Sequence, residues 1–338
     1  MRRSRSAAKK ASAIAPQNYL SNQFEGMLGV SLPMLEVFQA IIDAASADVP
    51  VLITGETGTG KDLVAGAIHK RSRRKDQPFI AVNMGAIPGE LLASELFGHE
   101  KGSYTGATAM RKGRFEEADG GTIFLDEIST MDQRSQVFLL RVLETKTFRR
   151  VGGEKDIHVD VRVIGATNEN LDTAIKSNRF REDLYYRLDV FRIHLPSLRE
   201  RLGGVRVLSE LFVAQFSQMY RKSLRSVAAD AMQCLENYSW PGNVRELKNV
   251  IQRAVLVAES GELTSDLLPA RIKNCGPSKR DANLANFPIH LGMTLEAVER
   301  EFIALTLASA GGNKKKTAAM LGISRRTLYD KLKKHHLA

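Results

Sequence analysis

The chain has 338 residues, 43% of them hydrophobic, and its 49 Lys and Arg residues against 38 Asp and Glu residues give a formal net charge of +11. No apolar run reaches the roughly 18 residues that cross a bilayer, which excludes a membrane-spanning protein, and the N-terminus lacks the apolar core of a secretory signal. The two cysteines, Cys234 and Cys275, fit neither a disulfide framework nor a zinc site. We therefore expect a cytoplasmic protein of two or three domains with a polyanionic partner.

Residues 1–24 differ in composition from the rest of the chain, with five Lys and Arg residues and no Asp or Glu. Such a segment cannot bury enough apolar surface to fold by itself, and we interpret it as a disordered basic tail. Its Arg- and Ser-rich composition also resembles a transit peptide, an alternative that the rest of the chain disfavours. A helix follows, because Pro33 stands at its first turn and apolar residues from Leu35 to Ile42 recur at helical spacing.

A glycine-rich turn lies between an apolar run that ends at Thr54 and a helical pattern that begins at Lys61. Strand, turn and helix in this order, with the spacing G-x-x-x-x-G-K, indicate a phosphate-binding P-loop, although an ordinary glycine-rich turn is the alternative. Backbone N–H groups of such a loop surround an anion, and the Lys61 amine reaches the β- and γ-phosphates of a nucleotide. The candidate nucleotide-binding residues are Gly55, Glu56, Thr57, Gly58, Thr59, Gly60, Lys61 and Asp62.

Asp62 departs from the general P-loop pattern. It stands where a Ser or Thr usually offers Mg²⁺ a hydroxyl. We therefore expect the metal to find its main protein ligand elsewhere or to be bound through water.

Two further apolar strands end in polar residues that are able to act on a nucleotide. Residues 78–83 end in Asn83, and residues 122–127 end in Asp126 and Glu127, about sixty residues after the P-loop. Adjacent acids at this position form a Walker B pattern, in which Asp126 binds Mg²⁺ and Glu127 polarises the attacking water. An acidic strand end or helix cap is the alternative. The Asn83 side chain is able to hold Glu127 inactive until nucleotide binds, or simply to complete a turn.

A fourth apolar run, residues 161–168, ends in Thr167 and Asn168, which are able to orient a water molecule or sense the γ-phosphate, and a fifth run covers residues 190–195. Because apolar strands alternate with helical patterns, we predict an α/β fold with a parallel sheet covered by helices on both faces. The candidate residues follow strands, where the carboxyl ends of a parallel sheet form a ligand site. Residues from about 205 to 258 have helical periodicity and indicate a small helical subdomain.

The last part of the chain forms a separate helical domain behind a polar linker that contains Gly and Pro. Two short helical segments meet at Gly322, and the second begins at Ser324, a residue suited to an N-cap. This spacing indicates an all-α helix-turn-helix domain, in whose recognition helix Leu328 and Leu332 pack inward. A solvated basic helix is the alternative. The candidate DNA-binding residues are Ser324, Arg325, Arg326, Thr327, Tyr329 and Lys331.

Six segments resemble the signature segments of one family. They read GETGTGK (55–61), ELFGHE (95–100), GSYTGA (102–107), GGTIFLDE (120–127), FREDLYYRL (180–188) and WPGNVREL (240–247). In sequence and order they resemble those of sigma-54-dependent transcriptional activators, bacterial enhancer-binding proteins of the AAA+ superfamily with a Fis-type helix-turn-helix. The resemblance runs from about residue 26 to the C-terminus and implies an ATPase that uses ATP and Mg²⁺. An acid commonly follows the P-loop Lys in this family, so Asp62 is ordinary there.

The resemblance also implies roles for residues that sense the nucleotide. Asn83 would be the switch Asn, Thr167 and Asn168 would form sensor I, and Arg245 would be sensor II in the lid.

Arg181 and Arg187 match the family's arginine fingers, which reach the ATP of a neighbouring subunit. An Arg that stabilises the transition state from a second subunit is worth roughly 10³–10⁵ in rate, so hydrolysis would depend on assembly. The resemblance therefore implies a ring, which is hexameric in this family.

Residues 102–107 resemble the loop that contacts sigma-54, which usually reads Gly-Ala-Phe-Thr-Gly-Ala. Here Ser103 and Tyr104 replace Ala and Phe. A Tyr keeps the aromatic face and adds a hydroxyl, so we expect contact of modestly altered strength; an incidental exposed aromatic residue is the alternative. The candidate sigma-54 contacts are Gly102, Ser103, Tyr104, Thr105, Gly106 and Ala107.

We therefore expect an ATP-driven activator that binds upstream enhancer DNA and remodels the closed complex of the sigma-54 RNA polymerase holoenzyme. The alternative is a DNA-binding regulator whose ATPase module serves assembly or sensing and does not act through sigma-54. Because about 25 residues precede the ATPase domain, we expect control through expression or a regulatory protein acting in trans. The predicted domains are the tail 1–24, the AAA+ core 25–200, the helical lid 201–270, the linker 271–290 and the helix-turn-helix domain 291–338.

Overall fold

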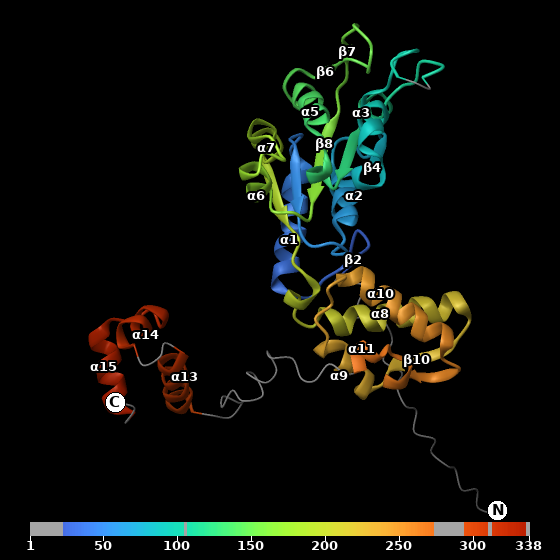
Figure 1. The fold of residues 1–338 in the computed structure, drawn as a ribbon. Coiled ribbons are helices and arrows are strands. Elements are labelled where there is room, and N and C mark those ends of the chain that lie inside the picture. The colour runs from blue at the N-terminus through green and yellow to red at the C-terminus, as the bar shows by residue number, and fades with distance from the viewer. Residues whose placement is uncertain (1–22, 105–106, 274–293, 310–312, 336–338) are drawn as a thin grey trace, which may run out of the picture. The chain divides into compact units, whose positions relative to one another are not determined.

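A computed structural model of the chain describes residues 23–104, 107–273, 294–309 and 313–335 (Figure 1). The chain divides into two compact units, residues 1–275 and 276–338. The predicted tail and the predicted linker lie almost entirely outside the described residues and stay predictions.

A five-stranded parallel sheet forms the centre of the first unit (Figure 1). Its strands are β3 (Val51–Thr54), β4 (Phe79–Asn83), β5 (Thr122–Asp126), β8 (Arg162–Thr167) and β9 (Phe191–His194). They run in the order β4-β5-β8-β3-β9, and every neighbouring pair is parallel. The predicted parallel sheet is confirmed, and the carboxyl ends of its strands meet at one edge.

Helices cover both faces of this sheet, so alternate residues of a strand enter different apolar clusters. In β5, Ile123 and Leu125 join one cluster and Phe124 joins the other. Helices α1 (Leu32–Ser46) and α2 (Lys61–Arg71) pack on the Phe124 face, and α3 (Gly89–Phe97), α5 (Gln133–Thr145) and α7 (Glu182–Leu188) pack on the opposite face. A strand buried on both faces needs a nearly continuous apolar run, and β8 is indeed buried at all of its positions.

Shorter elements complete the sheet domain. They are the antiparallel pairs β1 (Gln23–Phe24) with β2 (Met27–Leu28) and β6 (Thr147–Phe148) with β7 (Ile157–His158), the helices α4 (Arg114–Glu117) and α6 (Leu171–Lys176), and 3-10 turns at Met84–Ala86 and Ile128–Thr130. A further 3-10 turn, Leu198–Glu200, begins the lid side, because Leu198 packs in the apolar cluster of the lid.

A separate apolar core forms the lid. Its helices are α8 (Gly204–Tyr220), α9 (Ala229–Asn237), α10 (Asn243–Val257) and α11 (Ala270–Lys273), and a 3-10 turn covers Ser265–Leu267. The prediction of a helical subdomain over residues 205–258 did not include the strand β10 (Ser223–Val227). This strand pairs in parallel with β11 (Ser260–Leu263). The five residues of β10 include two Ser and one Arg, too little apolar alternation to indicate a strand.

In the second unit the described residues form the helices α13 (Leu295–Ser309), α14 (Lys314–Met320) and α15 (Arg325–Lys334). Leu328 and Leu332 of α15 are fully buried against Ile303 and Ala318, as predicted. Gly322 adopts a positive φ of 65° between α14 and α15, a conformation in which a glycine is favoured. None of the described helices has the length and apolar character to cross a membrane.

Trp240 is the single tryptophan of the chain and is fully buried in the lid core, where its Nε1 donates to the Leu235 carbonyl at 2.8 Å. We expect Trp240→Ala to lower the free energy of unfolding of the lid by about 3–5 kcal/mol, because it leaves a large cavity. Trp240→Phe removes mainly the hydrogen bond and should cost about 1–3 kcal/mol. Urea denaturation followed by circular dichroism measures both; a Trp240→Ala protein as stable as wild type would contradict this description of the lid core.

Candidate functional site

The P-loop joins β3 to α2 at the carboxyl edge of the sheet. Gly60 caps α2 with a positive φ of 102°, and Lys61 is the first helical residue. The Lys61 Nζ donates to the carbonyls of Gly55 at 2.9 Å and Glu56 at 3.2 Å, and only 8% of the residue is exposed. The amine is thus held inside the loop, where a bound phosphate would replace the carbonyls as its partner.

The surroundings of Lys61 shift the pKa of its ammonium group in two opposite directions. Burial lowers the pKa of its ammonium group, and the nearby carboxylates of Asp126 and Glu127 act in the opposite sense. The three side chains predicted from separate motifs are therefore close enough to interact. Phosphate oxygens at this point would favour the protonated amine further.

The acid pair stands at the end of β5, next to β4. The Asp126 Oδ1 accepts from the Glu127 N–H at 3.0 Å, and Glu127 adopts a left-handed conformation with a φ of 58°. The Glu127 carboxylate lies against the backbone of Gly85, because a Cβ at that position would be 1.9 Å from its Oε2. Any larger residue at position 85 would displace the carboxylate.

Asn83 performs a local role in this structure. Its Oδ1 accepts from the Ala86 N–H at 3.2 Å and caps the turn that contains Gly85. Among the described residues the structure has no hydrogen bond between Asn83 and Glu127, so the switch role implied by the resemblance stays a prediction. Both side chains nevertheless lie next to the same residue, Gly85.

Sensor I candidates connect β8 to the P-loop. Thr167 is fully buried, donates to the Ser129 hydroxyl at 3.2 Å and accepts from the Glu169 N–H at 3.0 Å. The Asn168 Nδ2 donates to the Thr57 Oγ1 at 3.0 Å. The residue that follows β8, the neighbour of β3 in the sheet, thus contacts the P-loop directly.

The lid contacts the P-loop from the other direction, mainly through Asn243. This residue is fully buried, its Nδ2 donates to the Glu56 carboxylate at 3.1 Å and to the Thr57 carbonyl at 3.0 Å, and its Oδ1 accepts from the Leu198 N–H at 2.8 Å. At Gly58 a Cβ would lie 2.3 Å from the Gly242 carbonyl, so only glycine allows this close approach.

Three arginines strengthen the contact between lid and P-loop. Arg199 forms an ion pair with Glu56, which together with Asn243 lowers the pKa of the Glu56 carboxyl. The Arg201 Nη2 donates to the Thr59 carbonyl at 2.9 Å, and burial lowers the pKa of Arg201 to about 10. The backbone N–H of Arg245, the sensor II candidate, donates to the Gly58 carbonyl at 3.2 Å.

The sequence did not predict a site role for Asn243, Arg199 or Arg201. The signal for Asn243 was present, because it lies in the segment WPGNVREL two residues before Arg245. Nothing local indicated Arg199 and Arg201, since their partners Glu56 and Thr59 lie 143 and 142 residues earlier in the chain.

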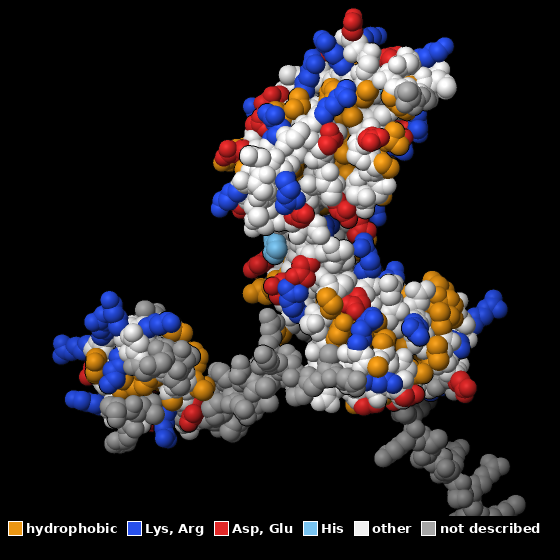
Figure 2. All heavy atoms as spheres, viewed as in Figure 1, with side chains coloured by type: hydrophobic (Ala, Val, Ile, Leu, Met, Phe, Trp, Pro, Cys, Tyr) orange, Lys and Arg blue, Asp and Glu red, His pale blue; other side chains and the backbone are white. Residues whose placement is uncertain are grey.

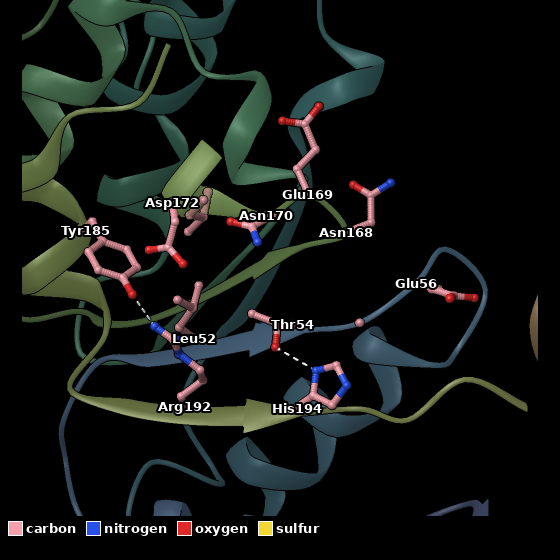
Figure 3. Close-up of a pocket in the computed structure, with 12 residues that line it drawn as sticks. Leu52, Thr54, Glu56, Asn168, Glu169, Asn170, Asp172, Tyr185, Arg192 and His194 are labelled. Atoms are coloured by element: carbon pink, nitrogen blue, oxygen red, sulfur yellow. Dashed lines mark hydrogen bonds between the residues drawn. The ribbon is translucent and has the colours of Figure 1, made fainter. Parts of the chain in front are cut away.

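A polar pocket opens beside the P-loop, at the carboxyl ends of β3, β8 and β9 (Figure 3). In it the Thr54 Oγ1 and the His194 Nδ1 are hydrogen bonded at 3.1 Å, and Arg192 bonds to the Tyr185 hydroxyl. Asn168 and Glu56 line its loop side, so the pocket adjoins the nucleotide site and extends toward α7.

The two finger candidates lie at the surface, Arg181 as the N-cap of α7 and Arg187 within that helix. The Arg181 side chain is 39% exposed and pairs with Asp183 at 2.6 Å, and the Arg187 side chain is 59% exposed and pairs with Glu144 at 3.1 Å. Both partners are acids of their own subunit. An exposed ion pair of this kind is worth about 0–1 kcal/mol, so each guanidinium is easily released to another partner.

Comparison with known proteins decides the family. Residues 27–194 match the family described as Sigma-54 interaction domain, residues 199–285 match the AAA+ ATPase lid domain, and residues 294–335 match the family described as Bacterial regulatory protein, Fis family. Transcriptional regulatory protein ZraR of Escherichia coli is 43% identical over 317 residues, which are 92% of this chain and 69% of ZraR. The chain belongs to the family of sigma-54-dependent transcriptional activators.

Other members of this family are longer. The nitrogen fixation protein VnfA of Azotobacter vinelandii is 46% identical over 311 residues, and this chain, with 92% of its length matched, spans 59% of VnfA. A crystal structure of NtrX from Brucella abortus in complex with ATP is 35% identical, with a TM-score of 0.69 over 95% of this chain and 72% of that chain. The predicted AAA+ fold is thereby confirmed.

The candidate sigma-54 contact loop of this family member extends from the sheet domain beyond α3. The Gly102 N–H donates to the Ala107 carbonyl at 2.8 Å, and Ala107 donates to the Tyr104 carbonyl at 3.0 Å. Tyr104 is 38% exposed, and its ring makes a T-shaped contact with the His99 ring at 5.1 Å between the ring centres. Ser103 packs on Gly152, where a Cβ would lie 2.6 Å away. Thr105 and Gly106 lie outside the described residues.

The predicted DNA-binding residues lie on α15, in the unit where Lys and Arg side chains gather (Figure 2). Ser324 caps the helix by accepting from the Thr327 N–H at 3.1 Å, and Arg325, Arg326 and Tyr329 are exposed. Lys331 differs from these residues. It forms an ion pair with Glu299 of α13, so its charge is partly neutralised within the domain.

We expect Lys61 and Glu127 to have separable roles. Lys61→Ala should lose ATP binding, because the amine neutralises the β- and γ-phosphates, whereas Glu127→Ala should keep ATP binding and lower hydrolysis by about 10²-fold or more. Titration with a fluorescent ATP analogue measures ATP binding and phosphate release measures hydrolysis, so together they distinguish the two variants. Equal ATP affinity in wild type and Lys61→Ala would refute the assignment of Lys61.

Proposed function

We propose that this chain hydrolyses ATP with Mg²⁺ and uses the energy to convert the closed complex of the sigma-54 RNA polymerase holoenzyme into an open complex. It would act from upstream enhancer DNA, in the cytoplasm. The observation that carries the proposal is the meeting of Lys61, Asp126 and Glu127 at the carboxyl edge of the sheet, beneath a lid that contacts the P-loop. Membership of the family indicates the protein partner, which is sigma-54.

The side chains divide the chemistry among them. Lys61 would neutralise the β- and γ-phosphates, and Asp126 would supply the protein ligand of Mg²⁺. Asp126 suits a metal that keeps water and phosphate oxygens as its other ligands, because no group of three or more acidic, His or Cys side chains able to hold a metal occurs among the described residues. Glu127 orients the attacking water.

We propose that the chain associates with itself into a ring, which the family resemblance makes hexameric, and the surface position of the fingers supports this proposal. Arg181 and Arg187 are exposed on α7 and bond to acids of their own subunit in this single chain. Supplied to the ATP of a neighbouring subunit, either guanidinium would stabilise the charge of the transition state. Hydrolysis would then require assembly.

We expect Arg181→Ala to retain nucleotide binding and to lose most ATP hydrolysis. Mixing it with Glu127→Ala protein should restore part of the turnover, because an intact finger then faces an intact Glu127 at some interfaces. The nearby Arg179→Ala is a matched control, since Arg179 forms a comparable surface pair with Glu169. Full activity of Arg181→Ala alone would mean that the finger is another residue.

The contact loop connects ATP hydrolysis to the polymerase. An exposed aromatic ring suits a protein surface better than nucleotide chemistry. The loop follows α3, which packs in the same apolar cluster as Ile128, the residue after Glu127. A change at Glu127 is therefore able to reach the loop through packed side chains.

Tyr104→Ala tests this proposal most sharply. It should retain ATP hydrolysis and enhancer binding and fail to open the promoter, whereas Tyr104→Phe should remain active because it keeps the ring. Phosphate release and promoter melting by sigma-54 polymerase are measured on the same preparations. Wild-type melting by Tyr104→Ala would favour the alternative, a DNA-binding regulator whose ATPase module serves assembly or sensing.

A further inference from the structure

The recognition helix α15 presents one carboxylate, Asp330, at the centre of its exposed face. Leu328 and Leu332 are fully buried and define the inward direction of the helix. At about 100° per residue, Asp330 projects from the side opposite the midpoint between these two leucines. The residue is exposed, as are Arg326 and Lys333 beside it.

Contacts with the other helices limit the free face from both sides. On one side Lys331 and Lys334 form ion pairs with Glu299 and Glu296 of α13. On the other side Lys314 of α14 lies over the Tyr329 ring, with its Nζ 5.1 Å from the ring centre. Between these contacts lies the surface that a helix-turn-helix inserts into the major groove.

Asp330 has no hydrogen bond or ion pair within the described part of the chain, although Arg326 lies one turn earlier on the same helix. Two other acids of this unit, Glu296 and Glu299, are paired with basic residues of α15. The Asp330 carboxylate is therefore free to accept hydrogen bonds from a bound molecule.

A carboxylate on this surface has a defined effect on DNA binding. It repels phosphates, so it weakens binding to DNA in general. In the major groove it accepts well from the N4 amine of cytosine, whereas adenine places the N7 acceptor beside its N6 amine and suits an amide side chain better.

We propose that Asp330 is a specificity-determining residue that accepts a hydrogen bond from a cytosine N4 amine and weakens binding to sites that lack this cytosine. The inference rests on the proposed DNA-binding function and names the base that one exposed side chain reads. Arg326, one turn earlier on α15, and Lys333, three residues later, are placed to contact phosphates or guanine.

The experiment selects bound sequences from random DNA duplexes with the full chain and measures affinities for single-base variants of the selected site. Wild type, Asp330→Ala, Asp330→Asn and the control Glu301→Gln are compared. Glu301→Gln removes the same charge from α13 rather than from α15.

We expect wild type and Glu301→Gln to prefer cytosine about tenfold at one position of the site. Asp330→Ala should lose that preference, keep the others and bind random duplexes at least as tightly as wild type, which also shows that the domain is folded. Asp330→Asn should move the preference toward adenine. An unchanged preference at every position in Asp330→Ala would overturn the inference alone, whereas a wild-type protein that selects no sequence would overturn the DNA-binding function as well.

Discussion

The P-loop backbone is bonded from two directions, and the rest of the nucleotide site depends on this arrangement. From the sheet, the Thr167 carbonyl accepts from the Gly55 N–H, and from the lid, Asn243 and Arg201 bond to the carbonyls of Thr57 and Thr59. Carbonyls that are bonded in this way leave the N–H groups of the loop facing inward, toward an anion. A nucleotide that fills the loop therefore acts on both the sheet and the lid.

The bonds between the P-loop and the lid also determine the surroundings of the two charged side chains of the loop, Glu56 and Lys61. Glu56 is the only acid within the loop sequence before Lys61, and Arg199 and Asn243 of the lid side bond to its carboxylate. Its negative charge is thus directed to the lid and away from the phosphates. The Lys61 amine, by contrast, is buried and close enough to Asp126 and Glu127 for their charges to influence its pKa, and phosphates with Mg²⁺ would neutralise all three. We therefore expect bound ATP to affect both the catalytic side chains and the position of the lid.

The sequence alone was sufficient for the sheet, because a strand buried on both faces is a continuous apolar run. Polar residues at the ends of such strands are conspicuous in the sequence, and the roles assigned to them stay predictions. It was insufficient where a partner is distant, as for Asn243 and Arg201, or where two local bonds compete, as at Asn83, whose side chain bonds to Ala86 rather than Glu127. The pairing of Lys331 with Glu299 likewise depends on how α13 packs on α15. Such tertiary contacts leave no periodic signal.

Hydrogen exchange of backbone amides tests most directly whether ATP couples the P-loop to the lid. The measurement compares the loop, residues 55–60, with the start of α10, residues 243–247, in the presence and absence of a non-hydrolysable ATP analogue with Mg²⁺. We expect both segments to become protected together, and neither to change in Lys61→Ala. Protection of the loop without any change at the start of α10 would contradict the coupling.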